Sequence, residues 1–292
     1  MENSKLAIVI AVHNRKIVTL HCLKQLKQQT YRDFFVVVVD DGSTDGTAEA
    51  ISQLYPTMEI ISGAGDWWWT KSVNKGIKSA LAKGATHVLL LNDDTYFNND
   101  YLSLVMDEVN KNPDSIIGSL NLTWELPHRI YFSGARSLNR FVFRYKRYHK
   151  TFSLYNDDPS INAFPSVYLP ARGALVPASA FKSIGLLNEK HFPQYASDVE
   201  FTLNASEKGI NMYVSSKMKL YTPIDSTGSG DIYKKESFIK FLSSFTNKYA
   251  KRDLRTNLKL ISHHVPAYIV PFAFLSYTCT IFTKYFLYKI RN

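Results

Sequence analysis

A short apolar run that ends in two adjacent carboxylates constrains this chain more than any other feature. The run covers residues 87–91, and Asn92, Asp93 and Asp94 follow it. An apolar stretch this short, bounded by polar residues, is typical of a strand buried on both faces of a sheet. Ligands of open α/β sheets collect at the carboxyl ends of such strands. We therefore expect the two aspartates at a ligand-binding edge; the alternative is that they only open a turn and cap the next helix.

Two earlier apolar runs end in the same way. They cover residues 6–12 and 34–39, and the polar residues that follow them are His13, Asn14, Arg15, Asp40 and Asp41. One more short strand is expected at residues 59–62. Helical periodicity follows each of the four expected strands, over residues 17–29, 48–54, 70–83 and 100–111. Alternation of strand and helix from residue 6 to residue 111 predicts a parallel sheet covered by helices. Asp45 is interpreted as a helix cap rather than a ligand.

The polar groups after these runs should converge, because the carboxyl ends of parallel strands share one edge of the sheet. Paired carboxylates suit a hard divalent cation, and a neighbouring arginine suits the diphosphate that such a cation neutralises. The chain has no Gly-x-x-x-x-Gly-Lys-Ser/Thr loop, and no Gly-x-Gly-x-x-Gly follows the first run. These absences disfavour a P-loop NTPase and a dinucleotide-dependent dehydrogenase.

The second half of the chain has a different pattern. Short β-like runs mix with basic and aromatic residues, a longer strand is expected at 167–176, and a helix is expected within 192–208. A Gly/Ser-rich loop at 225–231 precedes a basic helical segment at 234–261. The uncharged stretch 265–283 contains two prolines and several polar residues. We interpret it as a helix lying in a membrane interface; the alternative is a helix packed on the domain.

The charge balance limits the partners. The formal net charge is +10, which favours polyanions, namely nucleic acid, anionic lipid headgroups or phosphorylated substrates, without choosing among them. Two cysteines without metal-type spacing predict a reducing compartment. The N-terminus has no secretory signal pattern. We therefore expect a cytoplasmic protein.

The order of the motifs resembles that of inverting family 2 glycosyltransferases with the GT-A fold, in particular the rhamnosyltransferase-like subgroup. The resemblance covers about residues 5–215. It is carried by Val-Ile-Ala-Val-His-Asn-Arg at 9–15, Val-Val-Asp-Asp-Gly-Ser-Thr-Asp-Gly-Thr at 38–47, Trp-Trp-Thr-Lys-Ser-Val-Asn-Lys-Gly-Ile at 68–77, Leu-Leu-Leu-Asn-Asp-Asp-Thr at 89–95, Arg-Gly-Ala-Leu-Val-Pro at 172–177 and Phe-Pro-Gln-Tyr-Ala-Ser-Asp-Val-Glu-Phe at 192–201.

The resemblance implies an α/β fold of the GT-A type: a Rossmann-like mixed sheet with helices on both faces, followed by a C-terminal helical extension. The catalytic domain is expected at 1–232, with a nucleotide-binding half at about 1–111 and an acceptor half at about 112–232. The basic and apolar extension is expected at 233–292, where it could associate with a membrane.

The same resemblance implies roles for individual residues. Asp198 is expected to be the general base, and Asp94 to bind Mg²⁺ or Mn²⁺. The residues expected to bind the nucleotide-sugar are Ala11, His13, Arg15, Asp41, Trp68, Asn74 and Asp93, with Asp41 on the base and Asp93 on ribose or phosphate. Of three consecutive tryptophans, we expect one or two to pack on the core and one to border the sugar.

The chain departs from the family pattern around the base. Ser197 replaces the usual first acid, Glu200 the later aspartate, and Asn204 the usual arginine. Relatives often have a metal-binding histidine after this motif, whereas residues 215–231 contain none. The resemblance thus implies a metal held by Asp94, the diphosphate and water.

The leading hypothesis is an inverting sugar transfer, by direct displacement, from a nucleoside-diphosphate sugar, either dTDP-rhamnose or a UDP-sugar. The acceptor would be a glycan or a polyprenyl-diphosphate-linked sugar in bacterial surface polysaccharide synthesis, on the inner face of the cell membrane. A nucleotidyltransferase and a non-catalytic protein that binds glycan or nucleic acid are the alternatives. The basic segment 136–150 comes closest to a nucleic-acid surface, but we interpret it as acceptor-side or membrane-facing and expect no nucleic-acid partner.

Overall fold

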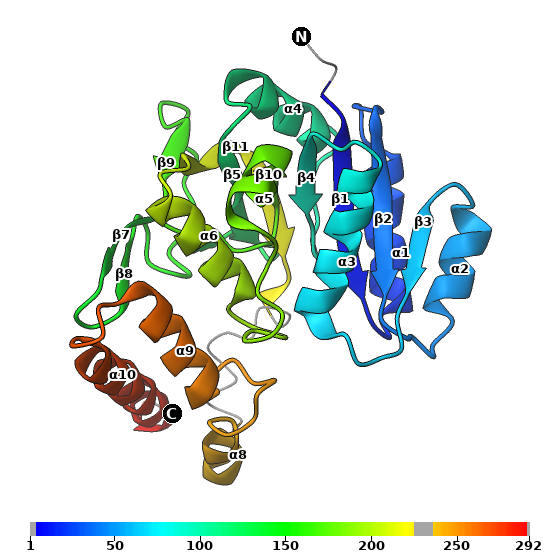
Figure 1. Ribbon diagram of the computed structural model, residues 1–292. Coiled ribbons are helices and arrows are strands. Elements are labelled where there is room, and N and C mark those ends of the chain that lie inside the picture. Colours follow the sequence, from blue (N-terminus) through cyan, green and yellow to red (C-terminus); the bar gives the residue numbers. More distant parts are fainter. Residues whose placement is uncertain (1–3, 225–235, 291–292) are drawn as a thin grey trace.

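A computed structural model describes residues 4–224 and 236–290. Its centre is a nine-stranded mixed sheet in the order β3-β2-β1-β4-β10-β5-β11-β9, with β6 paired to β5 (Figure 1). The predicted Gly/Ser-rich loop at 225–231 and the predicted domain boundary after residue 232 lie outside the described residues.

The first half of the chain forms the parallel part of this sheet, as predicted. The order β3-β2-β1-β4 joins only parallel pairs, and a helix follows each strand. The elements are β1 (Leu6–Val12), α1 (Lys16–Lys27), β2 (Phe34–Asp40), α2 (Thr47–Leu54), β3 (Glu59–Ser62), α3 (Trp68–Ala82), β4 (His87–Leu90) and α4 (Tyr101–Lys111). β1 and residues 34–39 of β2 are entirely apolar, as expected for strands that helices cover on both faces of the sheet.

The second half adds strands of both directions. The elements are β5 (Ile116–Thr123), β6 (Ile130–Phe132), β9 (Ala163–Pro165), β10 (Ala174–Pro177), α5 (Ala178–Ile184), α6 (Ser197–Glu207) and β11 (Met212–Thr222), and a separate hairpin of β7 (Ala135–Asn139) and β8 (Arg144–Arg147). β10 lies between β4 and β5 and is antiparallel to both. Its first residues therefore lie at the edge where β4 ends.

The strand predicted at 167–176 begins later than expected. Only residues 174–177 pair in the sheet. Pro170 has no N–H to donate to a ladder of hydrogen bonds. Gly173 has a φ of +75°, which belongs to a turn rather than to a strand. A Cβ at Gly173 would also lie 2.5 Å from Ser119 Oγ and 2.3 Å from Leu220 Cδ1. The turn at Arg172 and Gly173 therefore approaches β5 and β11 too closely for a larger residue.

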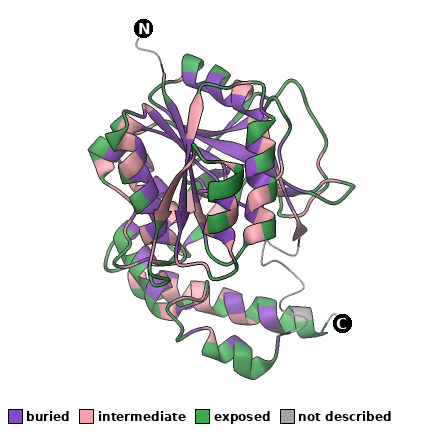
Figure 2. Ribbon diagram, turned by 90° about the vertical axis from the view of Figure 1, so that its right-hand side faces the viewer, coloured by how far each residue is buried: buried purple, intermediate pink, exposed green. Residues whose placement is uncertain are grey.

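Two helical layers enclose the sheet. α3, α5 and α6 contribute to the hydrophobic cluster on one face, and α1, α2 and α4 contribute to the cluster on the other. Figure 2 shows the central strands largely buried between helices whose outer sides are exposed, whereas strands at the edges of the sheet are only partly buried. This packing fixes the strand ends and leaves one edge of the sheet for a site.

The C-terminal extension consists of α8 (Phe238–Ser243), α9 (Leu254–His264) and α10 (Val270–Ile290). The continuous helix predicted at 234–261 is wrong, because residues 244–253 form a loop. Asp253 ends that loop: its carboxylate accepts from the N–H of Thr256 at 2.8 Å and so caps α9. Leu260, Ile261 and Ala273 join the core of the main domain.

The extension lies at the end of the molecule toward which β1, β2 and β4 point (Figure 1). Part of its surface is apolar and exposed, notably Phe272 and Leu275 on α10. Within residues 4–224 and 236–290, the structure has no helix that combines the length and the apolarity needed to span a membrane.

Candidate active site

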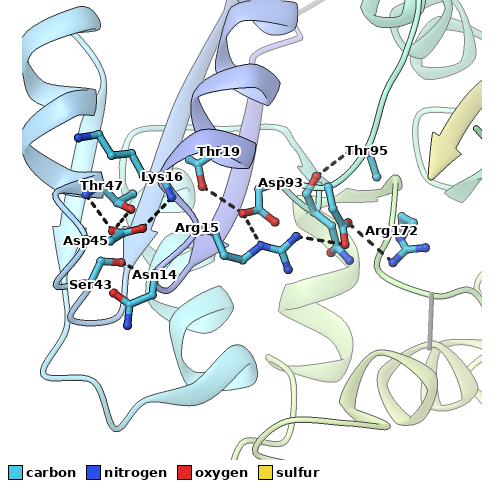
Figure 3. Close-up of polar contacts among 12 residues, drawn as sticks. Asn14, Arg15, Lys16, Thr19, Ser43, Asp45, Thr47, Asp93, Thr95 and Arg172 are labelled. Atoms are coloured by element: carbon cyan, nitrogen blue, oxygen red, sulfur yellow. Dashed lines mark hydrogen bonds and ion pairs between the residues drawn. The ribbon is translucent and has the colours of Figure 1, made fainter. Parts of the chain in front are cut away.

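Arg15 connects two of the predicted strand-end carboxylates. Its Nε lies 3.1 Å from Asp93 Oδ2, and its Nη2 lies 3.3 Å from Asp94 Oδ2 (Figure 3). Thr19, on the first turns of α1, donates to the same oxygen of Asp93 at 3.0 Å. The ends of β1 and β4 thus meet as the sequence predicted. Burial raises the pKa of Asp93 to about 6, against the effect of Arg15, and the charge of Asp94 adds to the increase.

Arg172 reaches the same place from the start of β10. Its Nη2 lies 3.8 Å from Asp94 Oδ1, opposite Arg15 (Figure 3). Only 13% of the Arg172 side chain is exposed, and its guanidinium lies over the ring of Tyr131. In the described part of the chain, Nε and Nη1 of Arg172 and Oδ1 of Asp94 are buried without any hydrogen-bond partner. Such groups are costly unless a ligand satisfies them.

Asp41 organises the loop that precedes α3. Its Oδ1 accepts from the N–H of Gly65, and its Oδ2 accepts from the N–H groups of Trp67 and Trp68, each at 2.9 Å. His13 Nδ1 lies 2.6 Å from the backbone oxygen of Asp41. The carboxylate therefore fixes the wall formed by this loop. Asp41 and His13 adjoin, as predicted, and a contact between Asp41 and the nucleotide base stays a prediction.

The three tryptophans divide as expected between core and surface. Trp67 and Trp69 pack against the core, whereas the indole of Trp68 is 38% exposed. Trp68 has a positive φ of 58° and stacks on Tyr249, with 3.5 Å between ring centroids and 9° between planes. Tyr249 belongs to the loop between α8 and α9. The C-terminal extension therefore contacts the loop that Asp41 holds.

Asp198 stands near the start of α6. Its Oδ2 accepts from the N–H of Ala171 and its Oδ1 from the N–H of Val199, both at 2.9 Å. Burial raises the pKa of Asp198 despite these two bonds, and Lys251 acts in the opposite direction. The N-cap of α6 is Ala196, which has no capping side chain. Asp198 is therefore not the N-cap, and each of its oxygens keeps a second lone pair for another donor.

The residues that depart from the family pattern have structural partners. The Ser197 hydroxyl bonds with Thr70 Oγ1 at 2.7 Å, which connects α6 to α3. The buried carboxylate of Glu200 lies 3.2 Å from Nδ1 of His263 on α9. These contacts tie α6 to the neighbouring helices.

The remaining predicted residues have different surroundings. Ala11 is half-buried near the end of β1. The buried amide of Asn74 bonds to the backbone N–H and carbonyl of Leu187 and to Glu189, so it anchors a loop to α3. Asp45 is not the N-cap of a helix, because those positions are Arg15 in α1 and Gly46 in α2. Its carboxylate still accepts from the N–H groups of Lys16 and Thr47, the first residues of these two helices (Figure 3).

The arrangement suits an anion with a high charge. Two arginines flank a pair of carboxylates, and Oδ1 of Asp94 is buried without a hydrogen-bond partner in the described chain. Across residues 4–224 and 236–290, no three or more His, Cys, Asp and Glu side chains converge on one metal position. A divalent ion here would take Asp94 as a protein ligand and the other ligands from the bound diphosphate and water.

The sequence model of the family "Glycosyl transferase family 2" matches residues 7–161, which is more than half of the chain. This protein belongs to glycosyl transferase family 2. It is therefore a glycosyltransferase, as the order of motifs predicted. Family membership also argues against the nucleotidyltransferase and the non-catalytic binding protein.

Relatives of this family 2 glycosyltransferase include rhamnosyltransferases. It is 24% identical over 225 residues to the N-acetylglucosaminyl-diphospho-decaprenol L-rhamnosyltransferase of Mycobacterium tuberculosis (strain ATCC 25618 / H37Rv), which covers 70% of this chain and 72% of the relative. It is also 24% identical over 222 residues to dTDP-rhamnosyl transferase RfbF of Shigella flexneri, covering 75% and 69% of the two chains.

The fold of this glycosyltransferase is similar to that of S. aureus TarS. One TarS structure superposes with a TM-score of 0.58 and 15% identity, over 91% of this chain and 50% of TarS, so this chain spans half the length of that protein. The 1–349 fragment of TarS superposes with a TM-score of 0.54 and 14% identity, over 98% of this chain and 90% of the fragment. The predicted GT-A architecture with C-terminal helices is confirmed.

Two groups at the site of this glycosyltransferase were not predicted from the sequence. Arg172 is the first residue of the motif Arg-Gly-Ala-Leu-Val-Pro at 172–177. Its place beside Asp94 depends on the antiparallel direction of β10, which the motif does not show. Tyr249 lies in a segment that was predicted to be helical. The capping residue Asp253 was the local signal that a loop precedes α9.

Proposed function

We propose that this glycosyltransferase moves one sugar from a nucleoside-diphosphate sugar to a hydroxyl of a glycan or lipid-linked acceptor, with inversion at the anomeric carbon. The observation that carries the proposal is the unsatisfied pair at the strand ends: a buried oxygen of Asp94 and two buried nitrogens of Arg172 without hydrogen-bond partners in the described chain. A bound cation would satisfy the oxygen of Asp94, and the oxygens of a diphosphate would accept hydrogen bonds from the two nitrogens of Arg172.

Asp94 fits a divalent ion, Mg²⁺ or Mn²⁺, because a buried carboxylate oxygen with a free lone pair is the ligand that hard cations prefer. When bound, the ion would neutralise charge on the departing nucleoside diphosphate. Arg15 and Arg172 would add positive charge on either side, and Nε and Nη1 of Arg172 would donate to phosphate oxygens. Asp93 would hold Arg15 in position and face the ribose or a phosphate.

Asp198 is the proposed general base. It accepts the proton of the acceptor hydroxyl while the hydroxyl oxygen forms its bond to the anomeric carbon and the bond from that carbon to the diphosphate oxygen breaks. The nucleoside diphosphate leaves with the electron pair of the broken bond. The hydrogen bonds from Ala171 and Val199 orient the carboxylate, and its raised pKa makes it a stronger base than an ordinary aspartate.

The proposed wall of the donor site is the loop held by Asp41, with Ala11 and His13 beside it and Trp68 toward the extension. Asn74 supports this wall indirectly, through the loop at Leu187. The names of the relatives favour dTDP-rhamnose over a UDP-sugar as the donor.

The proposed setting is surface polysaccharide synthesis on the cytoplasmic face of the membrane. The printed name of one relative specifies a diphospho-decaprenol-linked acceptor. In this chain, exposed apolar side chains gather on the extension: Phe238, Ile239, Leu242, Phe272, Leu275, Phe286, Leu287 and Ile290. Together with the net charge of +10, they support a peripheral contact with an anionic membrane.

The donor half of the proposal is tested by thermal shift and calorimetry. UDP, GDP and dTDP are each added with Mg²⁺, Mn²⁺ or chelator to the wild type, to Asp94→Ala, and to Asp107→Ala, an exposed position on α4, as the control. We expect one nucleotide to stabilise the wild type and the control only with metal, and Asp94→Ala to lose that effect. If no nucleotide stabilises the wild type under any metal condition, the proposed donor site is wrong.

A further inference from the structure

Four basic side chains from three distant segments lie close enough for the charges of three of them to act on the fourth, Lys284, and for the charge of Lys251 to act on Asp198. Arg144 and Arg147 come from β8, Lys251 from the loop before α9, and Lys284 from α10. Arg144 Nη2 donates to Thr280 Oγ1 at 3.0 Å, one helical turn before Lys284, so the hairpin and α10 are in contact. We call these four residues the cation cluster.

The cation cluster has no internal counterion. Within residues 4–224 and 236–290, no carboxylate lies within ion-pair distance of any of the four side chains. Desolvation lowers the pKa of Lys284, and the charges of Arg147, Arg144 and Lys251 lower it further. Like charges held together repel one another, so an anion that binds all of them would be stabilised.

The cation cluster adjoins the proposed base through two tyrosines. Arg147 Nη2 donates to the hydroxyl of Tyr168 at 3.2 Å, and the rings of Tyr168 and Tyr145 lie 4.3 Å apart. The hydroxyl of Tyr145 is buried without a hydrogen-bond partner in the described residues. Burial raises the pKa of Tyr145, and the charge of Asp198 is close enough to contribute to the increase. Lys251 is in turn the cation whose charge acts on Asp198.

The residues of the cation cluster come from different elements than those of the proposed donor diphosphate site. The donor diphosphate is proposed at Asp94 and Arg172, whereas the cluster lies on the hairpin and the C-terminal extension, near Asp198. A ligand with one end at the cluster and a hydroxyl at Asp198 would be an acceptor. Four cations, two of them arginines with planar forks, suit a phosphate or diphosphate better than a single carboxylate.

We propose that Arg144, Arg147, Lys251 and Lys284 bind a phosphate group of the acceptor and so place its hydroxyl at Asp198, with the Tyr145 hydroxyl facing the same ligand. The inference rests on the proposed function of Asp198 as the base. The phosphate can belong to a lipid-linked diphosphate or to a phosphodiester within a polymer. The two sources share the chemistry that the cluster recognises.

The test is a calorimetric titration of the protein already saturated with its nucleoside diphosphate and excess Mg²⁺, so that the donor site is filled. The probes are inorganic pyrophosphate and dimethyl phosphate. We expect pyrophosphate to bind the wild type, and Arg144→Gln/Lys284→Gln to weaken this binding by about 10- to 100-fold, as the loss of two charged hydrogen-bonding groups predicts. Lys251→Gln alone, at an exposed position, is expected to weaken it less.

Lys78→Gln/Lys182→Gln is the matched control, because it removes the same charge from exposed positions on α3 and α5. It should bind pyrophosphate as the wild type does. Binding of dimethyl phosphate as well as pyrophosphate assigns the cluster to any acceptor phosphate, and binding of pyrophosphate alone assigns it to a diphosphate. Both results support the proposal.

Three results would overturn it: no pyrophosphate binding by the nucleotide-saturated wild type, equal binding by Arg144→Gln/Lys284→Gln, or an effect of this double variant only on sedimentation with phosphatidylglycerol vesicles. The last result would make the cluster a membrane-contact surface. Failure of the nucleotide itself to bind would instead contradict the proposed function, so the two failures are distinguishable.

Discussion

The N–H of Ala171 donates to Asp198 Oδ2 at 2.9 Å, and Ala171 is the residue directly before Arg172. One short turn therefore positions both the proposed base and the arginine beside Asp94. The turn itself is fixed, because the N–H of Gly173 donates to Leu90 O at the end of β4 at 2.9 Å. A shift of this turn would move the base and the diphosphate contact together.

The first prediction concerns the pH dependence of transfer. Because burial raises the pKa of Asp198, the fraction of carboxylate available as base falls at a higher pH than it would for an exposed aspartate. The folded protein also binds this proton more tightly than the unfolded chain, so the contribution of Asp198 to stability falls as pH rises through its folded pKa. We expect log(kcat/KM) to decline with unit slope on the acid side, above the ordinary carboxyl range.

Asp198→Asn is the control for this profile. It should lower kcat by about 10²- to 10⁴-fold and remove the acid limb, while metal-dependent nucleotide binding persists. A variant with the same acid limb as the wild type would assign the titration to another group.

The second prediction concerns Arg172. Its Nε and Nη1 are buried without hydrogen-bond partners in the described chain, so a bound diphosphate would satisfy them. We expect Arg172→Gln to weaken nucleoside diphosphate binding by about 10- to 100-fold in calorimetry, and Arg172→Lys to restore only part of it, because an ammonium cannot form the planar fork. Arg32→Gln, outside the site, should bind like the wild type. Equal affinity of Arg172→Gln and the wild type would remove Arg172 from the donor site.

The third prediction concerns the packing of α3 on the sheet. A Cβ at Gly76 would lie 2.4 Å from Val9 Cγ1 and 3.1 Å from Val39 Cγ2. Gly76→Ala should therefore lower the free energy of unfolding in urea by about 1–3 kcal/mol, although alanine is the better helix former. Lys78→Ala, exposed on the same helix, should change it by less than about 0.5 kcal/mol. A Gly76→Ala protein as stable as the wild type would show that α3 can move off the sheet without cost.

The fourth prediction concerns the membrane contact. Phe272 and Leu275 are 68% and 63% exposed, so replacing both with serine should leave the melting temperature unchanged. The double variant should sediment with anionic vesicles at least about 10-fold less strongly, because burying one large apolar side chain contributes about 1.5–3 kcal/mol. Ile17→Ser/Leu54→Ser, which changes two exposed apolar residues on α1 and α2, is the control. Equal loss in both double variants would contradict a contact specific to α10.

The parallel half of the fold could be predicted because its signals are local. β1, β2 and β4 are formed largely by continuous apolar runs, and helical periodicity follows each strand from β1 to β4. The meeting of Arg15, Asp93 and Asp94 followed from the rule that parallel strands end at one edge. That part of the tryptophan triplet packs on the core was also expected, although the sequence did not show that these residues are Trp67 and Trp69.

The other half depends on pairings between distant segments. β10 has the same apolar character as β4, and its residues give no signal that it is antiparallel to β4. The place of Arg172 could therefore not be derived from the residues alone. Asn74 and Gly76 show a related limit, because both belong to a motif of the family but have packing roles in this structure. Asn74 anchors the loop at Leu187, and Gly76 lets α3 approach Val9.

The stacking of Trp68 on Tyr249 connects the first third of the chain with the last. A ribosome releases the loop before α3 long before the segment that carries Tyr249, so this contact forms only when the chain is nearly complete. During synthesis, the part of the proposed wall of the donor site that Tyr249 contributes is therefore added last, well after the strand ends that carry Asp93 and Asp94.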